Sequence, residues 1–273
     1  MSPASPGSAG RLKMIGDNTA DKEKMRYYVT ADIHGFYSVF HQGLADAGFF
    51  GDPEPHKLII LGDLFDRGNE AEKLQDFILR LMEEDSVILI RGNHEDLFED
   101  LATVDNGVPY EHHVHNGTYE TALSLTGYNP LMARLCASNF AKTARETPLF
   151  QKIIPAALDY YETERYIFVH GWIPCLPERW TAYGYWPCWR EAGEFEWRKA
   201  RWYNGMDAAQ NCKEEKTILC GHCRASYGHA KYENKGSDFG PDADYSPYYG
   251  PGVIALDACT AYSGKINIIV IED

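Results

Sequence analysis

The stretch that decides the fold is Leu58-Ile-Ile-Leu-Gly-Asp-Leu-Phe-Asp-Arg-Gly68. Its first four residues form a continuous apolar run, which is typical of a strand buried on both faces of a parallel sheet. The run ends at Gly62, and charged residues follow at once. Because open α/β sheets bind their ligands outside the carboxyl ends of the strands, this order predicts a binding site directly after a buried strand.

The same order, an apolar run followed by polar residues, recurs at four other places in the chain. The predicted strands are 26–30, 87–90, 166–169 and 217–220, and the polar residues after them are Asp32 with His34, Asn93, His170 and His222. Asp32 and His34 are two residues apart, so in an extended chain their side chains point the same way. With Asp63, three Asp or Asn oxygens and three imidazoles at five strand ends predict a metal site assembled across the sheet.

The spacing of apolar residues predicts the fold class. Helical periodicity over 36–47, 74–82 and 97–104 alternates with the first three strands, which is typical of a mainly parallel sheet with helical crossovers. The second half is expected to be helical over 118–150, then to form a hairpin (158–161 with 166–169) and strands over 217–220, 253–256 and 266–271. These later strands are predicted to form a second, more antiparallel sheet. We therefore predict one α/β domain over 25–273 behind a disordered tail, 1–24.

Composition limits the classes of partner. The net charge is −14, and so acidic a surface repels polyanions, which argues against a polynucleotide or an anionic membrane as the main partner. No window approaches the run of about 18 apolar residues that a transmembrane helix needs. The N-terminal stretch lacks the apolar core of a signal peptide, and the seven cysteines have no disulfide-framework spacing. The expected location is therefore a reducing cytoplasm.

Two sequence blocks carry a resemblance to a known family. The five fixed letters of Gly-Asp-x-x-Asp-Arg-Gly at 62–68 arise by chance at about one in a million per start position, and Gly-Asn-His-Glu follows at 92–95. From Asp32 to His222 the chain resembles the calcineurin-like metallophosphoesterase superfamily. More narrowly, it resembles the phosphoprotein phosphatase branch, with small bacteriophage and bacterial serine/threonine phosphatases and symmetrical diadenosine tetraphosphatases. The resemblance implies an α/β fold of two packed mixed β-sheets flanked by helices.

The resemblance also implies two divalent metal ions. One would be held by Asp32, His34 and Asp63, and the other by Asp63, Asn93, His170 and His222. Asp63 would bridge, because a carboxylate has two oxygens and can hold two cations. The expected metal is Mn²⁺, and a mixed oxygen and imidazole set also suits Fe, Zn or Ni.

Four further residues complete the machinery that the resemblance implies. A hydroxide between the metals would attack phosphorus in line, while His94 would protonate the leaving oxygen and Asp66 would accept the other ring N–H of His94. Arg67 would offer a planar fork for two phosphate oxygens. A second arginine is expected to help, and Arg201 is the choice, with Arg198 as the alternative.

The expected activity is metal-dependent hydrolysis of phosphomonoesters, on phosphoserine, phosphothreonine or phosphotyrosine in a protein or on a small phosphoester. Two alternatives stay open: a dinucleoside polyphosphate hydrolase, and a non-catalytic interaction module on the same scaffold. All six tryptophans lie between 172 and 202, where the preferred interpretation is an apolar cluster and the alternative is an aromatic wall that stacks a ring of the substrate. The segment 232–252 is either a lid or a plain solvated loop.

Overall fold

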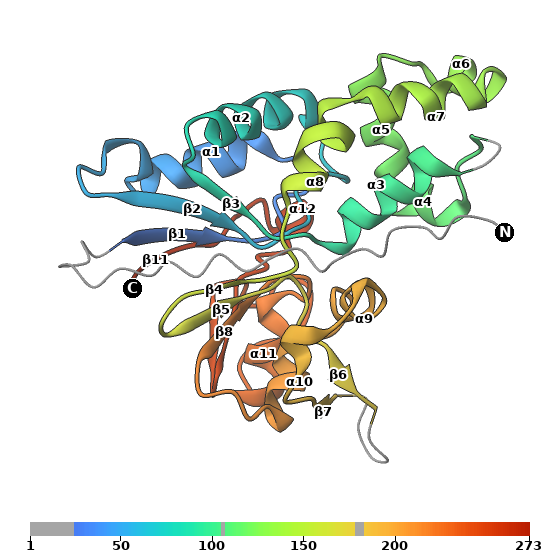
Figure 1. Cartoon of the computed structure of the whole chain (residues 1–273). Coiled ribbons are helices and arrows are strands. Elements are labelled where there is room, and N and C mark those ends of the chain that lie inside the picture. Colours follow the sequence, from blue (N-terminus) through green and yellow to red (C-terminus); the bar gives the residue numbers. More distant parts are fainter. Residues whose placement is uncertain (1–24, 105–106, 178–182) are drawn as a thin grey trace, which may run out of the picture.

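The computed structural model describes residues 25–104, 107–177 and 183–273, so the tail predicted over 1–24 lies outside the described residues. Two β-sheets face each other, and helices cover the outer face of each (Figure 1). The prediction of an α/β fold with two packed mixed sheets flanked by helices is confirmed.

The first sheet has the strand order β11-β1-β2-β3. The strands β1 (Arg26–Thr30), β2 (His56–Ile60) and β3 (Val87–Leu89) run parallel, and α1 (Tyr37–Asp46), the 3-10 helix η1 (Phe49–Gly51) and α2 (Ala71–Glu83) connect them. The last strand, β11 (Ile268–Glu272), pairs antiparallel with β1, so its predicted place in the second sheet is wrong. Ile268 packs on the helix side of the first sheet and Ile269 on the opposite side. Because β11 is apolar on both faces, its sequence is compatible with either sheet. It joins the first sheet because the edge of β1 is available for pairing there.

The second sheet has the order β4-β5-β8-β10-β9. Its three central strands, β5 (Tyr166–Phe168), β8 (Thr217–Cys220) and β10 (Val253–Ala255), are parallel, and the edge strands β4 (Tyr161–Glu162) and β9 (Tyr248–Gly250) are antiparallel to their neighbours. The predicted hairpin is confirmed as β4–β5. The expectation of a more antiparallel sheet is wrong for its centre, because helical connections between the central strands let the chain return in the same direction.

Helices and one small ladder complete the structure. Between β3 and β4 lie α3 (Asn93–Thr103), α4 (Glu111–His115), α5 (Thr118–Thr126), α6 (Pro130–Leu135), α7 (Ala137–Glu146), η2 (Leu149–Ile153) and α8 (Ile154–Ala156). The helical prediction for 118–150 is thus confirmed. The second half adds the ladder of β6 (Cys175–Leu176) and β7 (Gly184–Tyr185), then η3 (Trp189–Glu191), α9 (Glu194–Ala200), α10 (Gly205–Ala208), η4 (Ala209–Asn211), α11 (Ala225–Tyr232) and α12 (Thr260–Ser263).

Three apolar cores explain the continuous apolar runs of the strands. Along β1, Tyr28 faces the core under α1 and α2, whereas Tyr27 and Val29 face the core between the sheets. Successive side chains of a strand point to opposite faces, so both faces are covered and both must be apolar. The core between the sheets also takes Leu61 after β2 and Leu219 from β8. The site residues therefore leave the sheets from a rigid, fully packed base.

The tryptophan-rich segment divides into core and surface. Trp172, Trp189 and Trp197 are buried in the core on the outer face of the second sheet, so the apolar-cluster interpretation is confirmed for them. Trp186 packs against that core, whereas Trp180 lies outside the described residues. Trp202 is different, because half of its surface is exposed.

The segment 232–252 begins at the end of α11, contains β9 and is joined to α11 by side-chain contacts. Arg224, just before that helix, forms an ion pair with Asp238, and His229 Nε2 donates to the Ser246 carbonyl oxygen at 3.1 Å. No helix in the described ranges is long and apolar enough to cross a membrane.

Candidate metal centre

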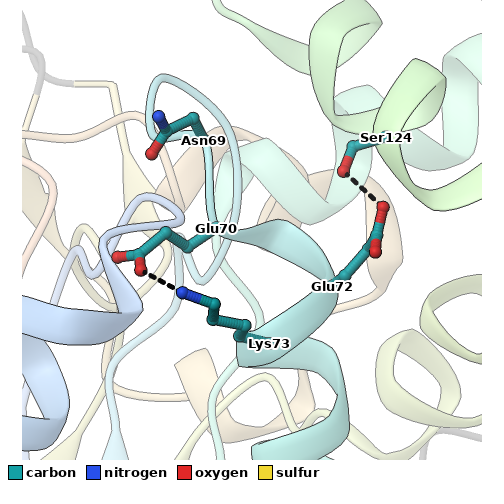
Figure 2. A pocket seen from close by; sticks show the side chains of 5 residues that line it. All are labelled: Asn69, Glu70, Glu72, Lys73 and Ser124. Atoms are coloured by element: carbon teal, nitrogen blue, oxygen red, sulfur yellow. Dashed lines mark hydrogen bonds and ion pairs between the residues drawn. The ribbon is translucent and has the colours of Figure 1, made fainter.

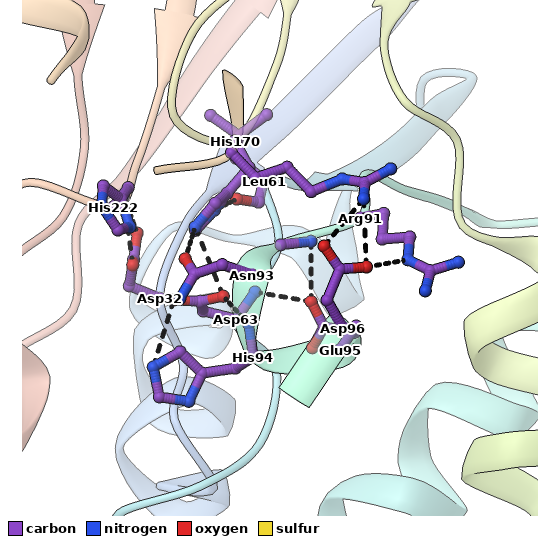
Figure 3. A network of polar contacts seen from close by, with 12 residues as sticks. Asp32, Leu61, Asp63, Arg91, Asn93, His94, Glu95, Asp96, His170 and His222 are labelled. Atoms are coloured by element: carbon purple, nitrogen blue, oxygen red, sulfur yellow. Dashed lines mark hydrogen bonds and ion pairs between the residues drawn. The ribbon is translucent and has the colours of Figure 1, made fainter. Parts of the chain in front are cut away.

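Five strand ends bring the six predicted metal ligands to one place between the sheets. Asp32 and His34 follow β1, Asp63 follows β2, Asn93 begins α3 after β3, His170 follows β5 and His222 follows β8. Figure 3 shows most of them gathered around Asp63. All are almost fully buried except His222, which is partly exposed. The carboxyl ends of parallel strands meet at one edge of each sheet, and the packing of the two sheets brings these two edges together.

The backbone at these strand ends adopts an unusual conformation. Nine described non-glycine residues have positive φ, and six of them are predicted site residues: Asp32, His34, Asp63, Asp66, Arg67 and His222. Such left-handed residues are sterically strained and cluster at functional sites. Two glycines let the chain approach the carboxylates, because a Cβ at Gly92 would lie 2.2 Å from Asp63 Oδ1 and one at Gly221 would lie 2.2 Å from Asp32 Oδ2.

Asp63 lies at the centre, and its two carboxylate oxygens face different imidazoles. Asp63 Oδ2 is 3.8 Å from both His34 Nε2 and His94 Nε2. Asp63 Oδ1 is 3.3 Å from His170 Nε2, which is also 2.8 Å from the Asn93 side-chain oxygen. The Asp63 carboxylate therefore lies between two groups of candidate ligands and belongs to both.

The donor atoms fit two metal ions. Two groups have ligand atoms that all lie within 4.8 Å of one another: Asp63 with His34 and His94, and Asp63 with His170 and His222. Oxygen and imidazole ligands bind Zn²⁺ at about 2.0–2.2 Å, so donors on one ion lie up to about 4.4 Å apart. Asp32 Oδ1, at 4.0 Å from His34 Nε2, flanks the first group. Small shifts of the side chains would bring the donor atoms of each group within bonding distance of one cation.

Hydrogen bonds turn two of the histidines toward the centre in the form that binds metal. His34 Nδ1 lies 3.0 Å from the Phe65 carbonyl oxygen, and His170 Nδ1 lies 2.6 Å from that of Leu61. A carbonyl only accepts, so each Nδ1 carries a proton and each Nε2 is the atom left to bind a metal. In His170 a metal would displace the proton that Nε2 directs at Asp63 and Asn93. Burial holds the pKa of His34 well below its usual value and lowers that of His222 to about 3, so both stay neutral.

The centre contains buried carboxylates, whose negative charge bound cations would balance. Burial, together with the charges of Asp257 and Asp63, holds the pKa of Asp32 well above its usual value. Burial also opposes the charge on Asp63, but His170 and His94 outweigh it and hold the Asp63 pKa well below its usual value. Burial likewise lowers the pKa of His170, but Asp63 outweighs it and raises that pKa. Cations bound at Asp63 would satisfy these carboxylates directly.

His94 differs from the other histidines, because its Nδ1 pairs with a carboxylate. Asp66 Oδ2 lies 2.7 Å from His94 Nδ1 and accepts a hydrogen bond from the Thr118 hydroxyl at 2.6 Å. Burial lowers the pKa of His94, but the charges of Asp63 and Asp66 outweigh it and raise that pKa. His94 is therefore arranged to hold a proton. The exposed Arg67 places a guanidinium nitrogen 3.4 Å from His94 Nε2.

Sequence reasoning missed the residues that hold these groups in place. Glu95 accepts backbone N–H bonds from Asp63 at 3.0 Å, Leu64 at 2.9 Å and Gly92 at 2.8 Å, which ties the loop after β2 to the start of α3. A glutamate at the third position of a helix is a known capping signal, so Glu95 could have been found. Thr118 carries no such signal, because it is brought to Asp66 only by the packing of α5.

Arg201 lies differently from its predicted place beside a phosphate. Its guanidinium donates to Asp96 at 2.8 and 3.0 Å and to Asp159 at 2.5 Å, with Glu194 at 3.1 Å, and its side chain is only 2% exposed. Among the described residues, no hydrogen bond or ion pair joins it to a predicted metal ligand. The alternative, Arg198, pairs with Asp100 at 2.9 Å. Carboxylates therefore occupy both guanidinium groups.

A separate pocket lies at the start of α2 (Figure 2). It is lined by Asn69, Glu70, Glu72, Lys73 and Ser124. Lys73 pairs with Glu70 at 3.1 Å, and Ser124 donates to Glu72 at 3.2 Å. No predicted site residue lines this pocket.

Comparison with solved structures supports the fold. The cold-active protein-tyrosine phosphatase of a psychrophilic Shewanella species superposes with a TM-score of 0.53 at 15% identity, over 91% of this chain and 75% of that one. At that identity the likeness concerns the fold alone.

Comparison with sequences identifies the family. Serine/threonine-protein phosphatase 1 of Salmonella typhimurium is 36% identical over 70 residues, which is 26% of this chain and 30% of that protein. The asymmetrical bis(5'-nucleosyl)-tetraphosphatase PrpE of a Geobacillus species is 33% identical over 76 residues, 26% of this chain and 31% of that one. The chain thus spans about a third of the length of these curated relatives. The profile of the calcineurin-like phosphoesterases, however, matches residues 25–256. The chain therefore belongs to the calcineurin-like phosphoesterase family.

Proposed function

We propose that this protein is a phosphatase that hydrolyses phosphomonoesters with two divalent metal ions. The observation that carries the proposal is the position of Asp63, whose two oxygens face separate histidine groups, beside the His94–Asp66 pair. A binding scaffold would need neither a shared carboxylate nor an imidazole that holds a proton. The family match over residues 25–256 supports the same reading.

Six side chains would hold the two ions. Asp32, His34 and Asp63 form one proposed set, and Asp63, Asn93, His170 and His222 form the other. When bound, the ions would act as Lewis acids and lower the pKa of water to near neutrality. The donor set suits Mn²⁺, our first choice, and also Fe, Zn or Ni. His94 belongs to one of the histidine groups, but its carboxylate partner favours a proton on the ring instead of a metal.

The remaining residues act on the phosphate and on the leaving group. Arg67 is exposed, and its charge acts on Asp32, His34 and His222, which supports our proposal that its guanidinium binds two phosphate oxygens. His94 would hold a proton on Nε2 and donate it to the departing oxygen. Asp66 would keep the His94 ring in one tautomer through Nδ1.

We propose a phosphorylated protein as substrate, with phosphoserine or phosphothreonine and also phosphotyrosine as the group removed. The relative named serine/threonine-protein phosphatase supports this choice. Hydrolysis of a dinucleoside polyphosphate is the second candidate, favoured by the half-exposed Trp202 beside His222.

All seven cysteines, each within the described ranges, are free thiols, which fits our expectation of a reducing cytoplasm.

The substitution His94→Asn tests the leaving-group step. A serine alkoxide needs a proton as it departs, whereas nitrophenolate largely does not. We expect kcat on a phosphoserine peptide to fall about 10²- to 10⁴-fold, the usual contribution of general acid catalysis, and far less on p-nitrophenyl phosphate.

The matched control is His41→Asn on α1. The His41 ring lies against Tyr37, Phe50 and Phe77, so this change should leave both rates unchanged. Equal losses on both substrates would remove His94 from this role. If the wild-type protein hydrolysed no phosphoester with added Mn²⁺, the proposed function itself would be wrong.

A further inference from the structure

Trp202 differs from the other tryptophans that the structure describes. Trp172, Trp189 and Trp197 are at most 3% exposed, whereas Trp202 is 50% exposed. Burying a large aromatic ring lowers the free energy of the folded protein. The half of the Trp202 ring that stays in solvent makes no such contribution to stability. Exposure alone assigns no role, since Phe195 is 66% exposed, so a role for Trp202 needs a second observation.

The position of the ring supplies one. The Trp202 ring centroid lies 5.7 Å from that of His222, and the two planes meet at 82°. The His222 ring lies 5.2 Å from that of His170. Three rings thus lead outward from the buried centre, and Trp202 is the most exposed of them. A substrate whose phosphate reached the centre would have its alcohol part near the indole.

The turn that carries Trp202 is held on both sides. The Trp202 N–H donates to the Lys199 carbonyl at 3.0 Å, and the Ala200 carbonyl accepts from Trp172 N at 3.0 Å. The turn lies so close to the chain after His170 that a Cβ at Gly171 would be 2.5 Å from the Ala200 carbonyl oxygen. Arg201, the next residue before Trp202, is held by Asp96 and Asp159. A ring carried by a fixed turn loses less entropy on binding a ligand than one carried by a mobile segment.

We propose that Trp202 is a stacking platform that makes this protein prefer phosphoesters whose alcohol part carries a flat aromatic ring. Every nucleobase and the phenol ring of tyrosine has a π-face, and stacking on an aromatic side chain does not require a particular sequence or hydrogen-bond pattern. The inference rests on the proposed function, since it concerns the same site. It adds the class of substrate that the site selects.

The experiment compares four substrates that share the phosphate and differ in the ring. A phosphotyrosine peptide and adenosine monophosphate carry one, whereas the same peptide with phosphoserine and glycerol phosphate do not. For Trp202→Ala we expect kcat/KM on the two ring substrates to fall about 5- to 150-fold, the range that stacking on one aromatic side chain supplies. The two aliphatic substrates should change less than threefold, and Trp202→Phe should recover most of the loss.

The matched control is Phe195→Ala. Phe195 lies on α9, seven residues before Trp202, and is 66% exposed, but its ring contacts Lys199 instead of a predicted ligand. This variant should match the wild type on all four substrates. Circular dichroism shows whether each variant is folded. If Trp202→Ala is not, Trp202→Leu carries the test, because leucine keeps an apolar side chain but has no aromatic face.

The outcomes separate the platform from a structural role. If kcat/KM of Trp202→Ala falls on adenosine monophosphate alone, the ring that stacks is a nucleobase; if it falls on the phosphotyrosine peptide alone, the ring is that of tyrosine. An equal loss on all four substrates, or no loss on either ring substrate, would overturn the platform while leaving the phosphatase intact. If the wild-type protein hydrolysed none of them, the proposed function would fail. Calorimetric binding of adenosine monophosphate against glycerol phosphate, to wild type and Trp202→Ala, would then still decide whether the ring binds there.

Discussion

Replacing Arg201 with methionine distinguishes two roles for one buried cation. Sequence reasoning placed Arg201 on the substrate phosphate, whereas the structure shows it bound to Asp96, Asp159 and Glu194. Methionine keeps an unbranched apolar stem but removes the charge. The variant therefore leaves buried carboxylates without their partner, and the loss should appear in stability before it appears in catalysis.

The magnitude follows from the partners that remain. Removing one member of a buried ion pair costs about 3–5 kcal/mol. The cost should lie near 3 kcal/mol here, because Asp96 keeps Arg91 at 2.7 Å and the Asp159 side chain is 28% exposed and partly hydrated. For a protein of about this size, 1 kcal/mol shifts Tm by about 2–4 °C, so Tm should fall by about 6–12 °C.

Thermal unfolding followed by circular dichroism measures this loss, and inhibition by inorganic phosphate measures binding at the site. The control is Arg198→Met, because that pair is between side chains 37% and 46% exposed, worth at most about 1 kcal/mol. If Arg201→Met kept its Tm within about 2 °C and weakened phosphate inhibition more than tenfold, Arg201 would bind phosphate and the structural reasoning would be refuted.

Two further predictions concern the residues around the centre. Asp63→Asn replaces the shared carboxylate with an amide that has one oxygen, so elemental analysis should find at most one metal ion per chain; two retained ions would exclude the bridge. Thr118→Val removes the 2.6 Å hydrogen bond to Asp66 and should lower kcat on phosphoserine about tenfold, the kinetic equivalent of about 1.4 kcal/mol, while p-nitrophenyl phosphate turnover changes little and Thr118→Ser restores the rate. A uniform loss on both substrates would mean that Thr118 only supports the fold.

The local features of the fold were predictable from short stretches of sequence. The strands β2 and β8 contain continuous apolar runs, and a glycine with a polar residue follows each run, at 62–63 and 221–222. Both the strand and its end are therefore encoded within about ten residues. The ligands that follow one sheet meet because its parallel strands end at a common edge, whereas the packing of the two sheets joins the two groups. The common-edge rule needs only the order of strands along the chain, which the periodicity supplies.

Contacts between distant segments were not predictable in this way. The run that forms β11 is apolar on both faces, and it pairs with β1, at the other end of the described chain, only because that edge is free. Likewise, α5 brings Thr118 to Asp66, although nothing in the sequence near Thr118 marks it as part of the site. Partner choice depends on the assembled molecule.

The sequence by itself determined the buried strands and the metal-competent residues at their ends, because each of these is a property of a few neighbouring residues. The tertiary structure alone decided which charges meet and which rings face water. Arg201 is held by carboxylates from α3 and from the chain before β4, and Trp202 stays exposed while Trp172 and Trp197 are buried. Burial and ion pairing are set by residues far along the chain, and those distances close only when the protein folds.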